Sequence, residues 1–511
     1  MIQPVSYRKN YLLTYFWQLL SILLGFLSLF VVVPYLSEDK MLYGIYSVCT
    51  SLTIFFSYAD LGFISAGVKY AAEYFIQGDK EKEVRMIGFV AFMMMMIFSV
   101  VSLIIIVCAV YPRLLIPELQ ERSAQFFLAR WLLATLAMSC PILIGQRVLS
   151  MIFTIRVEDY KLQRLSILGS LLKIISVFYF FRAGYYQLLE YYVFFQVVNL
   201  LVVTGAFLYV RKYGYKSGKM FSVIRFDKQI FDKVKQLSGT SLIMVIAMIL
   251  YYELDQIVIA NFVGIEMVAI YAIALSIMSF VRTFMSLLYS PYSSRYNHYH
   301  GAGDMEGLQR FVNKIVVELS PMVCCPIVVL SCLSAPFVES WVGDAYAKSA
   351  LLVTFMVISF IPNFLGTPVS AYFMAKEENL RLIRLNVLNV LIYWAGIVVT
   401  VHWMGIYSFA IFKSVAPVLV AVGYWVIVKR DFAKTGVPFV SLVKLLKVLL
   451  LPVVVALALC GIADRFMIYE HSKWALLNNL LLMGCCLVLS LAAALLTNKQ
   501  MRHTVCSLVK R

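Results

Sequence analysis

Apolar runs of about 20 residues recur along the whole chain and are separated by short polar connections. Roughly 20 apolar residues in a helix cross a bilayer core, which is about 30 Å thick. Of the 511 residues, 62% are hydrophobic and only 14% are charged, which is too little charge for the surface of a soluble protein of this length. The sequence therefore predicts an all-α polytopic membrane protein.

We expect fourteen transmembrane helices. The first run is too long for the core of a signal peptide and lacks a cleavage site, so we interpret it as a retained helix. The expected spans are residues 11–33, 42–66, 86–110, 126–150, 165–181, 188–210, 239–260, 267–290, 313–336, 349–374, 385–402, 408–428, 446–463 and 475–497.

The basic residues lie mostly on one side of these spans. About 32 of the 44 Lys and Arg residues fall on the side that holds both termini, and about seven fall on the other side. The positive-inside rule then places both termini in the cytoplasm. This distribution explains the net charge of +17 without a nucleic-acid partner. The connections carry no phosphate loop of the Walker or Rossmann type, so ATP hydrolysis is not predicted.

The two halves of the chain resemble each other. Residues 45–85 align without a gap with residues 270–310 and share ten identities, including the Gly-Asp-x-Glu of a polar connection. Because the two segments lie six spans apart, the alignment preserves orientation and predicts parallel repeats about an axis along the membrane normal. The predicted domains are an N-lobe of helices 1–6 (1–236), a C-lobe of helices 7–12 (237–430) and C-terminal helices 13–14 (431–511).

Five basic residues inside the spans are candidate substrate-binding cations of a cavity between the lobes. Lys173 lies about 12 Å from either end of its short span, too far for easy snorkelling, so a function is favoured over a buried pair with a structural carboxylate. For Arg282, a functional role and snorkelling to the membrane surface are equally favoured. Arg147, Arg130 and Lys413 lie nearer to span ends, which favours an interfacial position unless the cavity reaches them. Such a cavity would suit a phosphate-bearing anion.

Three acidic residues inside the spans, Asp60, Glu253 and Asp255, are candidates either for proton or cation coupling or for structural salt bridges. On a continuous helix, Glu253 and Asp255 lie about 200° apart, so only one of them would face the cavity. No spacing indicates a catalytic pair, so an enzyme is not predicted. The ten cysteines form no CxxC pair or loop cluster, so we expect neither a metal site nor disulfides.

Two stretches carry a family resemblance. One is Ala59-Asp60-Leu61-Gly62-Phe63, which continues through Lys69; the other is Asp255-Gln256-Ile257-Val258-Ile259, followed by Phe262-Val263-Gly264 and Tyr271. They are similar to motifs of the O-antigen and capsular-polysaccharide flippases in the multidrug/oligosaccharidyl-lipid/polysaccharide (MOP, MATE-like) superfamily. That family usually has Gly where Ala269 stands here.

The resemblance implies a two-lobe MATE-like fold in the cell (inner) membrane and transport by alternating access. The implied substrate is an undecaprenyl-pyrophosphate-linked oligosaccharide, moved from the cytoplasmic to the outer leaflet. The resemblance implies coupling to a proton or sodium gradient, with no other cofactor. It also implies that the last two helices receive the lipid tail. Expected partners are this lipid-linked diphosphate, membrane lipids and other polysaccharide-assembly proteins.

Other functions remain open. A lipid II (peptidoglycan precursor) flippase is close to the preferred interpretation. A multidrug exporter of the same superfamily commonly has twelve spans and favours cationic substrates. A membrane glycosyltransferase or polymerase would need catalytic carboxylates in sizeable outward loops, and none of these loops exceeds about 15 residues. A channel is least favoured, because no filter-like loop is visible.

Overall fold

The structure is a computed structural model that describes residues 7–53, 56, 62–182, 185–213, 223–289, 292–376, 378–498 and 500–502. These residues form helices and no strand, so the predicted all-α class is confirmed. The chain divides into two compact units, residues 1–269 and 270–511. The boundary lies within a helix, and the lobe boundaries that the sequence suggests stay predictions.

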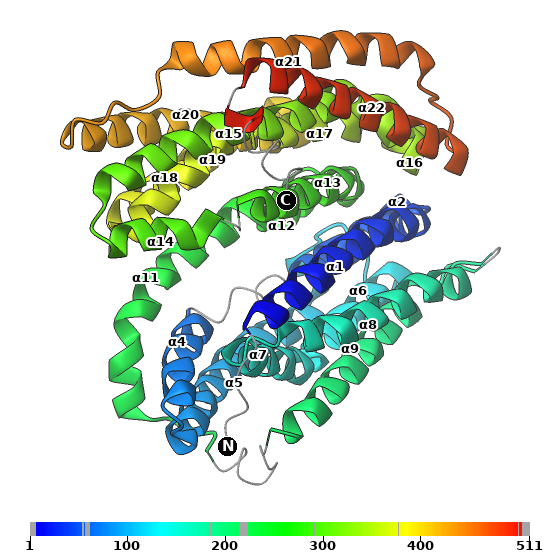
Figure 1. The fold of residues 1–511 in the computed structure, drawn as a ribbon. Coiled ribbons are helices and arrows are strands. Elements are labelled where there is room, and N and C mark those ends of the chain that lie inside the picture. The colour runs from blue at the N-terminus through cyan, green and yellow to red at the C-terminus, as the bar shows by residue number, and fades with distance from the viewer. Residues whose placement is uncertain are drawn as a thin grey trace. The chain divides into compact units, whose positions relative to one another are not determined.

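The first unit contains a long first helix that packs along α8, as Figure 1 shows. Its short helices α2 and α4 precede the long α5, and α11 and α12 follow α9 along the chain. The helices are α1 (Tyr7–Leu36), α2 (Lys40–Ser51), α4 (Phe63–Ile76), α5 (Lys80–Val110), η1 (Pro112–Leu114), α6 (Ala124–Met138), α7 (Cys140–Ile155), α8 (Asp159–Phe180), α9 (Leu188–Arg211), α11 (Lys228–Tyr252), α12 (Asp255–Phe262) and the first turn of α13 (Ile265–Tyr289).

The second unit is built around α15, which packs against α17, α18, α21 and α22. Its outer pair, α21 and α22, runs beside α15 in orange and red in Figure 1. After α13 the helices are α14 (Ser293–Gly301), α15 (Met305–Cys332), α16 (Ser334–Val342), η3 (Asp344–Tyr346), α17 (Lys348–Ile358), α18 (Asn363–Ala375), α19 (Asn379–Met404), α20 (Ile406–Ala433), α21 (Leu442–Ala463), η4 (Asp464–Phe466) and α22 (Lys473–Thr497).

The number of membrane-crossing segments agrees roughly with the predicted fourteen. Within the described residues, eleven helical segments are long and apolar enough to cross a bilayer, and the bent pair α17–α18 makes a twelfth. Two predicted spans are not among them. The span 42–66 includes residues outside the described ranges, and the span 239–260 is interrupted between α11 and α12.

The internal repeat recurs in the packing of each unit. In the first unit α5 packs against α4, α6 and α7, and α9 packs against α7 and α8. In the second unit α15 packs against α14, α17 and α18 in the same order, and α20 packs against α18 and α19. The same succession of helices therefore makes the same set of neighbours twice.

The repeated Gly-Asp-x-Glu sequence has a structural role. Gly78 and Gly303 adopt φ of 76° and 70°, the left-handed conformation that commonly ends a helix. The following residues, Asp79 and Asp304, then cap α5 and α15 through their carboxylates, which accept from backbone N–H groups at 3.1 and 2.8 Å. The motif thus ends one helix and starts the next at the same place in both units.

A second pair of matching turns joins α7 to α8 in the first unit and α18 to α19 in the second. The backbone N–H of Glu158 donates to the carbonyl of Phe153 at 3.0 Å, and that of Glu378 donates to Phe373 at 3.0 Å. The two turns therefore share this backbone hydrogen bond between a phenylalanine and a glutamate.

Candidate functional site

The predicted seventh span is broken at its acidic residues. α11 ends at Tyr252, and α12 begins at Asp255. Glu253, in the break, is 8% exposed, and Asp255 is fully buried. A carboxylate at the first turn of a helix is stabilised by the unpaired N–H groups and positive dipole end there. Discontinuous helices of this kind are a common feature of ion and substrate sites in transporters.

This break corrects one expectation from the sequence. Placing Glu253 and Asp255 on opposite sides of an axis assumes a continuous helix, and the helix is not continuous between them. The helical spacing therefore says nothing about which carboxylate faces a cavity. A Glu-Leu-Asp sequence between apolar runs carries no proline or glycine, so the usual signals of a break are missing.

The short helix α12 is held by polar contacts within the first unit. Ser47 of α2 donates to the amide oxygen of Gln256 at 2.7 Å, and both groups are buried. At the other end of α12, Asn261 donates to the carbonyl of Leu115 at 3.0 Å. The Glu118 carboxylate accepts from the backbone N–H of Ile265 at 3.2 Å, which caps the start of α13. The motif residues around Asp255 are thus fixed at both ends.

Lys173 lies on α8 and contacts neutral groups of α9. Its ammonium donates to the amide oxygen of Asn199 at 2.7 Å and lies 3.5 Å from the ring centroid of Phe195. Among the described residues no carboxylate forms an ion pair with it. An amide and an aromatic ring do not neutralise the charge of the ammonium group. The alternative considered above, a buried pair with a structural carboxylate, is therefore not seen among the described residues.

Lys413 is fully buried in the second unit. Its ammonium donates to the hydroxyl of the motif residue Tyr271 at 3.3 Å, and it lies 5.4 Å from the ring centroid of Tyr393. The interfacial position favoured from the sequence stays a prediction for Lys413.

The other candidate cations are placed as follows. Arg130 of α6 donates to the carbonyls of Ala109 and Val110 at 3.4 Å each, at the C-terminal end of α5, where a cation complements the helix dipole. Arg147 on α7 and Arg282 on α13 are both half-buried. Arg130, Arg147 and Lys173 belong to the first unit and Arg282 and Lys413 to the second, and the cavity between lobes stays a prediction.

The remaining motif residues have structural positions. Gly62 has φ of 79° directly before α4, and Gly264 has φ of 123° directly before α13, so both occupy conformations that suit glycine. Lys69 is exposed on α4, with its ammonium 5.6 Å from the ring centroid of Tyr70. Asp60 lies outside the described residues.

Reasoning from the sequence missed Glu318. This residue of α15 is 3% exposed, and its nearest ionic partner is Lys314 at 3.9 Å. Its Oε2 has no hydrogen-bond partner among the described residues. Glu318 lies within the predicted span 313–336, so a complete inventory of charges inside spans would have found it. A buried carboxylate with so few partners inside a membrane span is a candidate functional residue.

Two ion pairs near the matching turns, one buried and one half-buried, were also missed. In the first unit Arg156 pairs with Glu83 at 2.8 Å and lies between the rings of Phe75 and Tyr213. In the second unit Lys376 pairs with Asp431 at 2.5 Å. These residues lie at predicted loop boundaries, where the sequence leads us to expect a charged side chain to be solvated.

Comparison with known proteins gives one weak sequence match and several structural ones. No known family model matches the chain. A stretch of 146 residues, 27% of the chain, is 25% identical to an uncharacterized membrane protein, EpsK, of Bacillus subtilis (strain 168). The match spans only 28% of that protein.

The fold is similar to that of solved transporters. The lipid II flippase MurJ in an inward closed conformation matches with a TM-score of 0.65 at 14% identity, over 94% of this chain and 98% of that one. An inward-facing multidrug resistance MATE family transporter of the MOP superfamily gives 0.62 at 14% identity, over 81% and 95%. A eukaryotic MATE transporter, AtDTX14, gives 0.55 at 16% identity, over 83% and 96%.

These matches establish the fold. The chain is a multi-pass membrane protein with the fold of MOP-superfamily transporters. The similar structures are flippases and transporters rather than enzymes.

Proposed function

We propose that this multi-pass membrane protein flips an undecaprenyl-pyrophosphate-linked oligosaccharide from the cytoplasmic to the outer leaflet of the cell (inner) membrane. Both termini lie in the cytoplasm, and the substrate passes through a cationic cavity between the two lobes by alternating access. Other polysaccharide-assembly proteins supply the substrate and take up the product.

The extent of the structural similarity carries this proposal. The flippase match covers 94% of the chain, and the part left uncovered is too short to hold both α21 and α22, so the match includes at least part of that pair. The MATE match covers 81% of the chain. A flippase-like fold that extends into the last two helices favours a lipid-linked substrate over a drug.

The outer surface of the last two helices supports the same substrate class. Large apolar side chains on α21 and α22 are exposed in the isolated chain. Such a surface suits contact with lipid, and a groove along it would receive the tail of a lipid-linked sugar. The exposed residues include Leu446, Leu450, Val454, Leu457, Leu481, Val488 and Leu489.

The cations within the helices support an anionic headgroup. Lys173 contacts only neutral groups among the described residues, so its charge is available to a diphosphate. Arg282 adds a guanidinium, whose planar donors match phosphate oxygens. We infer that Lys173 from one lobe and Arg282 from the other bind the diphosphate during transport.

A proton or sodium gradient would supply the energy. Glu253, Asp255 and Glu318 are buried carboxylates, and charged groups inside membrane spans commonly mark ion pathways. Glu318 joins the candidates for ion coupling, because one of its oxygens has no hydrogen-bond partner among the described residues.

A lipid II flippase is supported equally by the fold, because the flippase structure with the broad match acts on lipid II. Both substrates carry a diphosphate on a long polyprenyl chain, so the cationic residues do not distinguish them. A multidrug exporter is the remaining alternative, and the similarity to a MATE transporter supports it.

Leaflet-resolved transport in vesicles tests the proposal. The purified chain would be reconstituted with a lipid-linked oligosaccharide, lipid II or a cationic dye, with and without proton and sodium gradients. Transport of the oligosaccharide lipid alone is the expected result. Lys173→Ala and Arg282→Ala should each lower it at least about tenfold, the effect of losing one charge-assisted phosphate contact.

The matched control replaces exposed cations at the start of α21. Lys444 and Lys447 are exposed on the first two turns of α21, and Lys444→Gln with Lys447→Gln should leave transport unchanged. Unaltered transport in both Lys173→Ala and Arg282→Ala would contradict the cationic cavity. Transport of lipid II or of the dye, without transport of the oligosaccharide lipid, would contradict the proposed substrate.

A further inference from the structure

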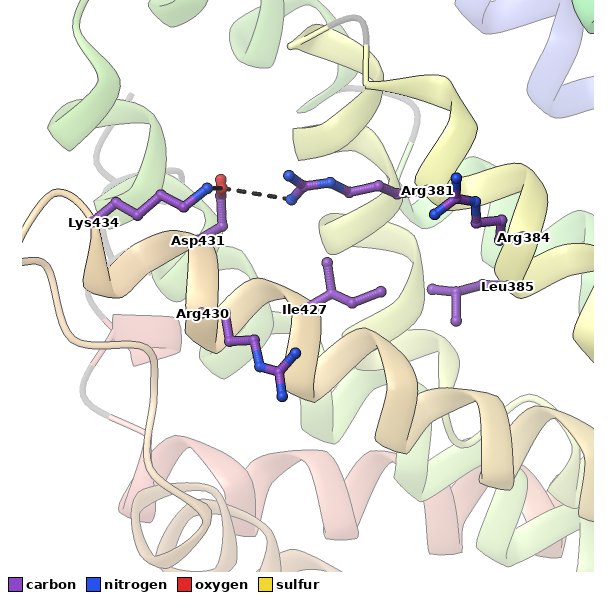
Figure 2. Close-up of a pocket in the computed structure, with 7 residues that line it drawn as sticks. All are labelled: Arg381, Arg384, Leu385, Ile427, Arg430, Asp431 and Lys434. Atoms are coloured by element: carbon purple, nitrogen blue, oxygen red, sulfur yellow. Dashed lines mark hydrogen bonds and ion pairs between the residues drawn. The ribbon is translucent and has the colours of Figure 1, made fainter.

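A cleft of about 380 Å³ opens between the ends of α19 and α20 in the second unit. Leu385 of α19 and Ile427 of α20 face each other across it, with charged side chains around them, as Figure 2 shows. Both helix ends belong to the side that the sequence predicts to be cytoplasmic. Four basic residues line this basic cleft: Arg381, Arg384, Arg430 and Lys434.

The one acidic residue that lines the basic cleft is already neutralised. Asp431 is 3% exposed, and its carboxylate accepts from Lys376 at 2.5 Å and from the hydroxyl of Tyr372 at 2.7 Å. Lys434 and Arg381 approach the same carboxylate at 3.3 and 3.6 Å. Asp431 therefore holds two of the cleft cations in place and presents little of its own charge.

The charges around the basic cleft do not balance. Among the residues that the structure describes, its four lining cations and Lys376 face two carboxylates, Asp431 and Glu378, which leaves an excess of three positive charges among them. Arg384 and Arg430 form no hydrogen bond or ion pair with any described residue, and both are exposed. Two guanidinium groups near an open cleft suit an anion with several oxygens, above all a phosphate group.

The surface beyond the basic cleft is apolar. Leu388 and Leu391 on α19 and Val422 and Val426 on α20 follow the cleft toward the middle of the two helices, and 39–61% of each residue is exposed. α19 and α20 pack against each other along their length and qualify as membrane-crossing helices. A ligand that fits both regions has an anionic head and an apolar tail.

We propose that the basic cleft binds the headgroup phosphate of an anionic membrane phospholipid. Arg384 and Arg430, on opposite sides of the cleft in Figure 2, attract the anionic headgroup, and the acyl chains lie along the exposed apolar side chains of α19 and α20. Basic pockets between transmembrane helices on the cytoplasmic side are known to recognise anionic lipid headgroups. The bound lipid stays with the protein and is separate from the transported substrate.

Lipid binding to the purified full-length chain tests this proposal by native mass spectrometry. The probes are phosphatidylglycerol, phosphatidylethanolamine with the same acyl chains, and inorganic pyrophosphate. The wild-type chain should retain phosphatidylglycerol in preference to the zwitterionic lipid. Arg384→Gln with Arg430→Gln should weaken phosphatidylglycerol binding by about tenfold or more, because two interfacial cations are lost.

A matched variant separates a site from general attraction. Lys444→Gln with Lys447→Gln removes the same charge from exposed positions of the same unit and should change phosphatidylglycerol affinity less than about twofold. Both double variants keep side-chain length roughly, and a normal thermal unfolding temperature would show that they fold. Equal loss in the two variants, no loss at Arg384 and Arg430, or pyrophosphate binding as tight as that of the lipid would each overturn the proposal.

Discussion

Gly264 shows how a single residue fixes the start of a membrane helix. Its φ of 123° lies in a region that side chains with a Cβ rarely adopt. An added Cβ would also lie 3.0 Å from the carboxylate oxygen of Glu118, the same side chain that caps α13. The backbone conformation therefore explains why the motif Phe262-Val263-Gly264 ends in glycine, which the sequence alone does not show.

Replacing Gly264 should destabilise the protein. Gly264→Ala forces a strained backbone and disturbs the Glu118 cap, and we expect a loss of about 1–3 kcal/mol. Thermal unfolding of the purified chain in detergent would measure the loss. Gly484 on α22 has no neighbour within 4 Å of an added Cβ, so Gly484→Ala serves as the control and should be neutral or slightly stabilising. Equal unfolding temperatures in the two variants would contradict this explanation.

Asp227 lies outside the membrane-spanning segments, and its charge state can be followed through its effect on stability. It caps α11 by accepting from the N–H groups of Gln229 and Ile230, and Arg85 donates to it at 2.5 Å. Burial acts to raise the pKa of Asp227, but the hydrogen bonds from Arg85 and the helix N-terminus outweigh it and hold that pKa below its usual range.

The stability due to Asp227 should depend on pH in a defined direction. A depressed native pKa contributes stability above the unfolded value of about 3.9, and this contribution is lost as pH falls toward the native pKa. Asp227→Asn should therefore unfold at a lower temperature than wild type near pH 6, by about 1 kcal/mol of stability. The difference should shrink as pH is lowered from about 4. A gap that stays constant down to about pH 3 would count against a charged Asp227.

At the scale of helices, the matching turns at Arg156 and Lys376 place a buried cation at the end of α7 and a half-buried one at the end of α18. Each cation finds a carboxylate from a different helix: Glu83 of α5 in the first unit and Asp431 of α20 in the second. These pairs fasten helix ends that lie far apart in the sequence. Desolvation makes such pairs costly to break, although an apolar replacement of both partners can be neutral.

Breaking one side of the first pair should be strongly destabilising. Glu83→Gln leaves the Arg156 guanidinium buried without its countercharge, at a cost of about 3 kcal/mol. Glu83→Leu combined with Arg156→Met should recover most of that loss. The exposed pair of Arg310 and Glu306 is the control, and Glu306→Gln should cost less than about 0.5 kcal/mol. Chemical or thermal unfolding would order the variants, and a double replacement as unstable as Glu83→Gln would contradict the argument.

Hydropathy predicted most helices, because a bilayer leaves the backbone little choice other than helix. It did not predict the break between α11 and α12, which rests on tertiary contacts such as that of Ser47 with Gln256 rather than on a local breaker residue. The same limit applies to the site. Lys173 was found because it interrupts an apolar run, whereas burial of Lys413 and Arg156 depends on helices that the sequence does not place.

At the scale of the whole molecule, the last two helices are integral to the second unit. The fully buried side chain of Asn479 on α22 donates to the carbonyls of Pro336 and Ile468 at 3.0 and 2.8 Å and to the hydroxyl of Ser340 at 3.1 Å. Near the end of α22, Asn498 donates to the carbonyl of Val317 in α15 at 2.7 Å. These bonds hold both ends of α22.

Loss of Asn479 should loosen this attachment. Asn479→Leu removes the amide that donates to the carbonyls of Pro336 and Ile468, and an unsatisfied buried group costs about 1–3 kcal/mol. Limited proteolysis of the connection between α21 and α22, followed over time in detergent, should be faster than in wild type. The neighbouring Asn478 is half-buried and donates to the carbonyl of Phe466 at 3.3 Å, so Asn478→Leu is the control. Indistinguishable cleavage rates would show that Asn479 does not hold the pair.

The repeated turns at Gly78-Asp79 and Gly303-Asp304 also bear on ancestry. Two segments with the same helix end, the same cap and the same neighbours are most simply explained by duplication and fusion of one gene. The half-length ancestor would have worked as a pair of identical chains. After fusion, each copy could change independently of the other. This accounts for a buried lysine in one half that has no lysine at the matching position in the sequence of the other half.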